Sequence, residues 1–102
     1  MIITSEQLRQ VNTIQTIVSR VTGIKMLDIC QNSRKAEIVQ ARHLSMYFCR
    51  FYTRITTKEI AKAHGKDNHA TVLHACKMIE NDIHRNRKLQ EIIQKIKSEL
   101  GV

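Results

Sequence analysis

Apolar residues recur along this chain at intervals of three and four, the spacing that places side chains on one side of an α-helix. In the first quarter of the sequence, the residues with this spacing are Leu8, Val11, Ile14, Val18 and Val21. Thr4 and Gln7 stand before most of them as a capping-box pair, and Gly23 follows as a typical helix stop. The pattern therefore predicts a first helix between Thr4 and Gly23.

A longer pattern follows a short interruption. Residues 25–30 predict one helical turn, and the polar residues 31–35 predict a basic loop. A long helix is then expected from about residue 36 to about residue 53. Its buried side is expected to consist of Ala41, Leu44, Ser45, Phe48, Phe51 and Tyr52. Its opposite, exposed side is expected to carry Arg42, His43 and Arg50.

The second half of the chain predicts two helices joined by a tight turn. Thr56 and Glu59 form another capping-box pair, which opens a short helix that Gly65 ends. After the turn, a helix is expected from Asn68, whose side chain can accept a hydrogen bond from a free backbone N–H, to about His84. A short helix, a glycine turn and a second helix form the helix-turn-helix arrangement.

A last helix is predicted over residues 88–100. Its apolar stripe consists of Leu89, Ile92, Ile93, Ile96 and Leu100. We expect this helix to dock on the core of the same chain. A dimer seam is the alternative, although fewer than three sustained heptads are present.

Composition adds a fold class and a candidate partner. The chain has 102 residues, no proline and three glycines, so we expect one compact all-α, multi-helix domain over residues 1–102. Lys and Arg number 17 and Asp and Glu number 9, and the resulting net charge of +8 attracts polyanions. Nucleic acid is the first candidate partner, and an anionic membrane surface is the second.

Cysteine usage and the length of apolar runs indicate a compartment. The three cysteines are odd in number, lack Cys-x-x-Cys spacing and fall within apolar patterns, as reduced core residues of a cytosolic protein do. The first residues lack the charged and apolar regions of a secretion signal, and no apolar run approaches ~18 residues. We therefore expect a cytoplasmic protein with no membrane partner.

Three histidines spaced five residues apart raise the question of a metal site. Ligands on a helix share a face when they are three or four residues apart, whereas His64, His69 and His74 are each rotated from the next by about 140°. Gly65 also interrupts the helix between the first two, and Cys or Glu partners at ligand spacing are missing. No bound metal is expected.

The helix from Asn68 is predicted to have two distinct sides. The side expected to be buried consists of Val72, Cys76, Ile79 and Ile83. A neighbouring side consists of Asn68, Thr71, His74, Ala75 and Met78. Short polar side chains there suit base edges, since Asn can pair with adenine and Ala leaves room for a thymine methyl group. Backbone N–H groups at a helix N-terminus also favour phosphate. The alternative interpretation is an ordinary N-cap followed by a solvated side.

The segment GKDNHATVLHACKMIE, residues 65–80, resembles the signature of the C-terminal DNA-binding domain of the bacterial replication initiator DnaA. In many members that signature reads approximately Gly-(Gly or Lys)-Arg-Asp-His-Thr-Thr-Val-Leu-His-Ala. The residues at the family's positions are Gly65, His69, Thr71, Val72, Leu73, His74, Ala75 and Cys76, followed by the basic residue Lys77. Similarity of pattern extends from about Thr4 to Glu80.

The resemblance implies a mostly helical domain that binds double-stranded DNA of the DnaA-box type. It places the second helix of the helix-turn-helix in the major groove and a basic loop in the adjacent minor groove. The helix residues that it implies in base recognition are Asn68, His69, Ala70, Thr71, His74 and Ala75. In the loop, Arg34 aligns with the arginine that enters the minor groove, and Lys35 adds a phosphate contact. On the long helix, Arg42 matches a family arginine and His43 stands where a Gln is usual.

Two departures from the family pattern concern sequence recognition. Asn68 stands where the family has a base-contacting Asp, which exchanges a pure acceptor for a group that both donates and accepts. Ala70 stands where the family has a Thr, which removes a hydroxyl group. We therefore expect a target other than the family's usual DnaA box.

Motifs for catalysis are absent from the sequence. Full initiators of the resembled family carry an ATPase module with a phosphate loop, and the three glycines here do not have that spacing. No Ser-His-Asp set, carboxylate pair or activated Cys-His pair is found, so neither enzymatic activity nor a cofactor is expected. The chain is either an excised part of a larger initiator polypeptide or a free-standing relative, and other replication proteins are further candidate partners.

The leading hypothesis is sequence-specific binding of duplex DNA at the nucleoid, in replication initiation or its regulation. Phosphate anchoring is assigned to Lys35, Arg42, Lys66 and Lys77. The alternative is a helical protein–protein interaction module with incidental basic charge, and cations spread over opposite sides of the fold would favour it. RNA binding is disfavoured, because all four Phe and Tyr residues fall in one predicted core helix.

Overall fold

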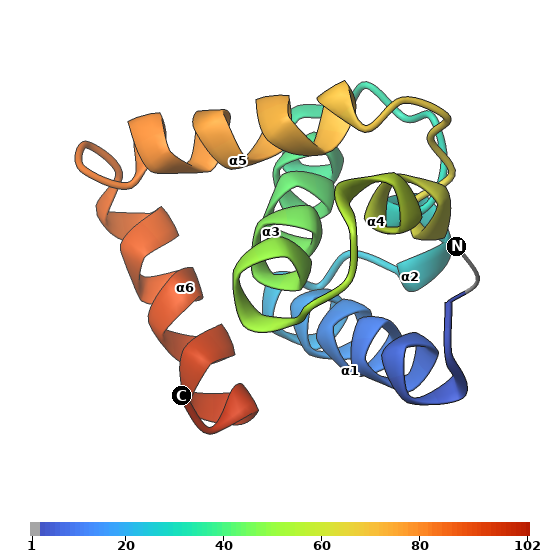
Figure 1. Ribbon diagram of the computed structural model, residues 1–102. Coiled ribbons are helices and arrows are strands. Elements are labelled where there is room, and N and C mark those ends of the chain that lie inside the picture. The colour runs from blue at the N-terminus through green and yellow to red at the C-terminus, as the bar shows by residue number, and fades with distance from the viewer. Residues whose placement is uncertain (1–2) are drawn as a thin grey trace.

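The computed structural model describes residues 3–102, and the regular elements within that range are all helices. They are α1 (Ser5–Thr22), α2 (Met26–Ile29), α3 (Ala36–Tyr52), α4 (Thr57–Ala63), α5 (Ala70–Asp82) and α6 (Arg87–Leu100) (Figure 1). The predicted all-α fold is confirmed, and α4, its glycine turn and α5 form the predicted helix-turn-helix.

Helix α3 is the element around which the others pack. Its contacts with α5 and α1 are the most extensive in the fold, and α2 and α4 also contact it. Figure 1 shows α5 crossing one end of α3 and α1 crossing the other, with α6 descending from the far end of α5. Helix α6 in turn packs on α1. The central position of α3 means that more than one of its sides is buried.

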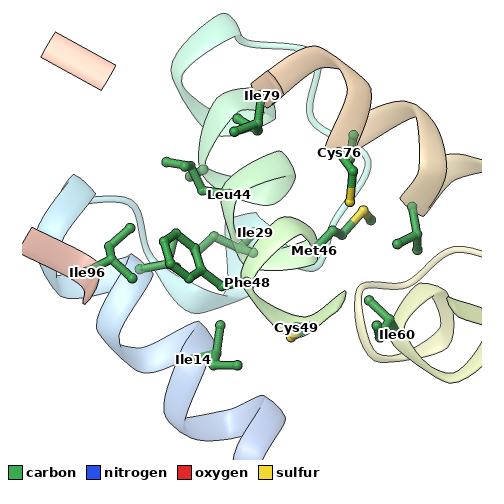
Figure 2. Packing of buried hydrophobic residues seen from close by; sticks show 14 of the residues in the cluster. Ile14, Ile29, Leu44, Met46, Phe48, Cys49, Ile60, Cys76, Ile79 and Ile96 are labelled. Carbon is green, nitrogen blue, oxygen red and sulfur yellow. The ribbon is translucent and has the colours of Figure 1, made fainter. Parts of the chain in front are cut away.

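The core residues of α3 point toward different neighbours. Figure 2 shows Phe48 close to Ile96 of α6 and Ile14 of α1, whereas Met46 lies toward Cys76 of α5. Phe48, Met46 and Cys76 are all fully buried. Burial raises the pKa of the Cys49 thiol, also in this core, to about 12, so the group stays protonated.

The burial predicted for α3 was therefore only partly right. Ala41, Leu44, Ser45 and Phe48 are buried as predicted, but Phe51 is 51% exposed and Tyr52 is also exposed. These two residues lie in the last turn of α3, where the Phe51 ring is tilted against Tyr47 at 4.9 Å and the Tyr52 ring stacks on Phe48 at 5.2 Å. A single-sided pattern describes a helix covered from one direction, and α3 is covered from several.

The caps predicted from the sequence set the boundaries of α1. The Thr4 hydroxyl accepts from the Gln7 N–H and the Gln7 side chain accepts from the Thr4 N–H, both at 3.1 Å, which confirms the capping box. Gly23 ends the helix in the left-handed conformation. Burial begins only at Val11, because the first turns of α1 project from the core; Leu8 is 48% exposed, which the pattern did not predict.

The second capping box is half formed. The Thr56 hydroxyl accepts from the Glu59 N–H at 3.2 Å, which caps α4 as predicted. The Glu59 carboxylate does not close the box among the described residues; instead it lies 4.0 Å from the Lys62 ammonium group.

Helix α6 docks on the core of its own chain. Leu89, Ile93 and Ile96 are buried, and Ile92 and Leu100 are partly buried against the same cluster. Asn86 caps the helix by accepting from the Leu89 N–H at 3.0 Å. The apolar stripe is therefore used within the chain, as the first interpretation of it predicted. Among the described residues, no helix combines the length and apolar character needed to cross a lipid bilayer.

Candidate nucleic-acid interface

The N-terminal end of α5 is exposed to solvent. We call residues 67–71 the α5 tip; residues 67–70 are exposed and Thr71 is partly exposed. Asn68 Oδ1 accepts from the Ala70 N–H at 2.9 Å, and the Asn68 carbonyl accepts from the Thr71 N–H at 3.1 Å. The helix thus begins at Ala70, two residues later than predicted, behind a turn that Asn68 stabilises. Because this turn uses one lone pair of Oδ1, both donors of the Asn68 NH2 group stay free to contact a ligand.

The two predicted sides of α5 are largely distinct in the structure. Val72, Cys76 and Ile79 are buried, and His74, Lys77 and Met78 are exposed. Ala75 is fully buried in the cluster that α3 and α5 share, so its predicted place beside a base is wrong. A helical wheel cannot resolve this boundary, since Ala75 lies next to Cys76 and its small side chain fits where the two helices are in close contact.

The basic loop, residues 31–35, lies beside the α5 tip. Lys66, which directly precedes the tip, donates from its ammonium group to Asn32 Oδ1 of the loop at 2.5 Å. Arg34 and Lys35 are exposed. In Figure 1 the chain segments that precede α3 and α5 run along the same edge of the molecule. Cationic residues from two segments far apart in sequence are therefore gathered at one edge: Arg34 and Lys35 from the loop, and Lys66 from the turn before α5.

The residues just before the tip and just before the loop are also in backbone contact. Gly65, in the turn after α4, has a φ of 73°, and a β-carbon on it would clash with the carbonyl oxygen of Cys30. The sequence identified Gly65 as a helix stop but gave no signal of this close approach. Asn32, the partner of Lys66, was missed for the same reason, because the contact joins segments 34 residues apart.

Arg42 is not on an exposed side of α3. It is 5% exposed, and its Nε donates to the Ile29 carbonyl at 2.9 Å while its terminal nitrogens donate to carbonyls of residues 28, 31 and 33. Burial lowers the pKa of the guanidinium group, and the nearby Cys30 partly offsets this effect. The predicted exposure of Arg42 was wrong because the end of α2 and the loop cover this side of α3.

His43 and His74 form a pair where α3 meets α5. Their rings meet edge to face, with centroids 5.9 Å apart and an interplanar angle of 87°. His74 is exposed and His43 is partly buried. The pKa of His43 is lowered by burial first and then by the positive charges of His74 and Arg42, against the opposing effect of Asp82. His43 is therefore neutral at pH 7, and it lies beside the exposed His74 of α5.

His64 belongs to the core and not to the tip. It is fully buried, its Nδ1 lies 2.7 Å from the Ile60 carbonyl, and its Nε2 lies 2.6 Å from the Ser45 hydroxyl. Burial lowers its pKa to about 4, so the ring is neutral. Since a carbonyl can only accept, Nδ1 donates to Ile60, and the Ser45 hydroxyl donates to Nε2. Within residues 3–102, no three His, Cys, Asp or Glu side chains gather as a metal site would require.

Comparison with known proteins identifies a family for this arrangement. A family model described as the bacterial dnaA protein helix-turn-helix matches residues 11–79. The chromosomal replication initiator protein DnaA of Bacteroides thetaiotaomicron is 37% identical over 88 residues, which are 86% of this chain and 19% of that protein. The protein of the same name from Thermodesulfovibrio yellowstonii is 35% identical over 86 residues, 84% of this chain and 20% of that protein.

The match includes the whole of the candidate interface. The chain spans only 19–20% of the length of these relatives. The matched residues 11–79 nevertheless contain the basic loop, α4, the glycine turn and most of α5. The chain therefore belongs to the bacterial DnaA helix-turn-helix family.

Proposed function

We propose that this chain binds double-stranded DNA and recognises its sequence. One observation carries the proposal: the exposed α5 tip and the exposed Arg34 and Lys35 lie at one edge, joined by the Lys66–Asn32 hydrogen bond. A helix tip fits the major groove of B-DNA, and an arginine beside it can enter the adjacent minor groove. The family to which the chain belongs is a helix-turn-helix family, which agrees with this geometry.

The tip supplies the groups that would contact base edges. The NH2 group of Asn68, the ring of His69 and the hydroxyl of Thr71 are polar and short, and Ala70 offers a methyl group. His74 continues this surface along α5, where His43 borders it.

Phosphate contacts are assigned to the surrounding cations. Lys35 belongs to the basic loop, Lys66 directly precedes the α5 tip, and the exposed Lys77 lies farther along α5. Binding of Lys66 to a phosphate is compatible with its fold contact, since an ammonium group has three donors. Arg34 is assigned to the minor groove.

The position of the charges favours duplex binding over the alternative of a protein–protein interaction module. Three of the chain's 17 Lys and Arg residues, Arg34, Lys35 and Lys66, meet at the edge where the helix tip is exposed. Arg42 is buried and does not add to this cluster. A cationic patch of this kind beside a protruding helix end suits a grooved polyanion.

The relatives give this binding a biological setting. They are chromosomal replication initiator proteins DnaA, and we propose that the present chain acts in replication initiation or its regulation, within a larger initiator polypeptide or with other replication proteins. Because Asn68 and Ala70 replace an Asp and a Thr of the family signature, its target is proposed to differ from the family's usual box.

Selection of bound duplexes from a random pool tests the proposal. One preferred sequence should emerge, and affinity for it should fall with salt at a log–log slope of about −3, since about three phosphates are contacted. Lys77→Ala should weaken all duplexes alike and reduce the slope by about 0.9, whereas Lys95→Ala on the distant α6 should change neither. Absence of any preferred sequence, or a flat salt dependence, would contradict the proposal.

A further inference from the structure

We propose that Arg42 is a positioning residue, which shapes the basic loop so that Arg34 is presented beside the α5 tip, and that it does not itself anchor a phosphate. The proposal rests on the duplex-binding function proposed above. Arg34 and Arg42 are the two arginines expected from the sequence to contact DNA, and the structure buries Arg42.

The guanidinium group of Arg42 is occupied by backbone carbonyls. Nε donates to Ile29 at 2.9 Å, and both terminal nitrogens donate to Ser33 at 3.3 Å. One terminal nitrogen also donates to Gln31 and, at 3.5 Å, to Asp28. No carboxylate forms an ion pair with Arg42 among the described residues. These acceptors span the end of α2 and the first half of the basic loop.

These carbonyls need a donor for a physical reason. Asp28 and Ile29 end α2, so no further turn of the helix supplies N–H partners for both of their carbonyls. The Asp28 carbonyl also accepts from the Gln31 N–H at 3.3 Å, so Arg42 is an additional donor to it. A planar guanidinium group with five N–H donors can satisfy several of them at once. The chain between α2 and α3 is thereby drawn toward one buried side chain.

The loop has few other means of keeping its shape. Gln31, Asn32, Arg34 and Lys35 are exposed, so little apolar burial holds the loop. Its other contacts include the Lys66–Asn32 hydrogen bond and the close approach of Gly65 to Cys30, which immediately precedes the loop. Within and beside the loop, the Gln31 N–H donates to the Asp28 carbonyl and the Lys35 N–H donates to the Ser33 hydroxyl, both at 3.3 Å. The Ser33 carbonyl, held by Arg42, belongs to the peptide unit that leads directly into Arg34. Fixing that unit prepares the position of Arg34 before DNA arrives, which lowers the entropy cost of binding.

Arg42→Lys separates positioning from phosphate contact. Lysine keeps the positive charge and would serve a phosphate, but it cannot form the forked set of carbonyl bonds. We expect Arg42→Lys to weaken binding of the selected duplex roughly tenfold, the cost of ordering one or two side chains on binding. The matched control is Arg50→Lys, an exposed arginine on the same helix, which should leave affinity unchanged.

A double-mutant cycle then asks through which residue Arg42 acts. If it acts by presenting Arg34, Arg42→Lys should cost little further affinity once Arg34→Ala has been made. Independent, additive losses would overturn the proposal. A phosphate contact would behave differently: Arg42→Lys would bind with full affinity, and Arg42→Met would reduce the salt slope by about 0.9. That pair of results would also overturn the proposal.

A measurement on the free protein separates this inference from the proposed function. NMR order parameters of residues 31–35 should drop below about 0.6 in Arg42→Lys while those of α3 and α5 stay near the wild-type values. This result is expected whether or not the wild type binds duplex DNA. Unchanged loop order would overturn the inference, and so would global unfolding of Arg42→Lys at 25 °C, because the proposed action is confined to the loop.

Discussion

Gly65 and the carbonyl group of Cys30 approach each other so closely that the turn between α4 and α5 has no room for a β-carbon. The turn of the helix-turn-helix is thereby pressed against the chain that leads into the basic loop. Lys66 adds its hydrogen bond to Asn32 one residue later. The two parts of the proposed interface are thus fixed to each other and not merely adjacent.

Gly65→Ala is expected to cost more stability than the same change at a comparable glycine. At a φ of 73° an alanine is strained by about 1–2 kcal/mol, and here the backbone of Cys30 must also move. We expect a total loss of roughly 2–4 kcal/mol in the free energy of unfolding, measured by urea denaturation. Gly23→Ala is the matched control, with a φ of 77° and nothing within 4 Å of the added carbon, and should lose about 1 kcal/mol. Equal losses at the two sites would show that the clash is relieved without cost.

Stability should depend on pH through His64. Its pKa in the folded protein is about 4, against about 6.5 for an ordinary histidine, so the unfolded chain takes up the proton first as pH falls. The free energy of unfolding should therefore be constant above pH ~7.5 and decrease between pH ~6.5 and ~4, by up to ~3 kcal/mol. Burial and the charges of His74 and Arg42 also lower the pKa of His43, which adds a smaller decrease of the same sign.

His64→Gln supplies the control for this pH dependence. A neutral amide has no proton to gain, so this variant should be less stable than the wild type at pH 7 but should lose most of the decrease below pH 6.5. Denaturant titrations at several pH values measure both quantities. A decrease of the same size in wild type and variant would mean that carboxylates or other histidines cause it.

Local chemistry explains which parts of the fold were predictable. The Thr4–Gln7 capping box, the Gly23 stop and the apolar stripe of α6 depend on residues within one or two turns of each other, and the structure confirms all three. Asn68 was predicted to cap α5, and its side chain does accept a backbone N–H, that of Ala70. The helix nevertheless begins after His69, so this bond closes a turn just before the helix.

The errors concern contacts between segments far apart in sequence. Arg42 was placed outside and Phe51 inside because one side of α3 was assumed to be covered, whereas several neighbours surround most of the helix and its last turn projects past them. Ala75 was misplaced because its burial depends on where α3 crosses α5. The apposition of Asn32 and Lys66 also lay beyond any local pattern, since it requires two loops to meet.

The two phenylalanines of α3 should differ strongly in their contribution to stability. Phe48 is fully buried between α1 and α6, whereas Phe51 is half exposed on the last turn. Phe48→Ala is expected to cost roughly 3–5 kcal/mol, because it removes apolar burial and leaves a cavity. Phe51→Ala should cost about 1 kcal/mol or less, mainly through its contact with Tyr47. Thermal or urea unfolding of both variants checks the difference, and similar losses would contradict the burial of α3 described here.

Restoring the family residues at the α5 tip should change the preferred DNA sequence without changing the fold. In Asn68→Asp a carboxylate oxygen replaces Oδ1 and can still accept from the Ala70 N–H, so the 2.9 Å hydrogen bond of the turn before α5 is kept. The NH2 donor is lost, however, and a pure acceptor faces the bases. Ala70→Thr adds a hydroxyl at an exposed position.

The double variant Asn68→Asp, Ala70→Thr is therefore expected to select a different duplex from the same random pool, nearer to the family's usual box. Each altered base contact should change discrimination by about 1–3 kcal/mol, or roughly 5- to 150-fold, in competition binding. Lys77→Ala is the control, because loss of a phosphate contact weakens all sequences alike and leaves the order of preference unchanged. If the double variant instead selects the wild-type sequence with unaltered discrimination, the α5 tip does not contact bases through residues 68 and 70, and recognition must come from elsewhere on the molecule.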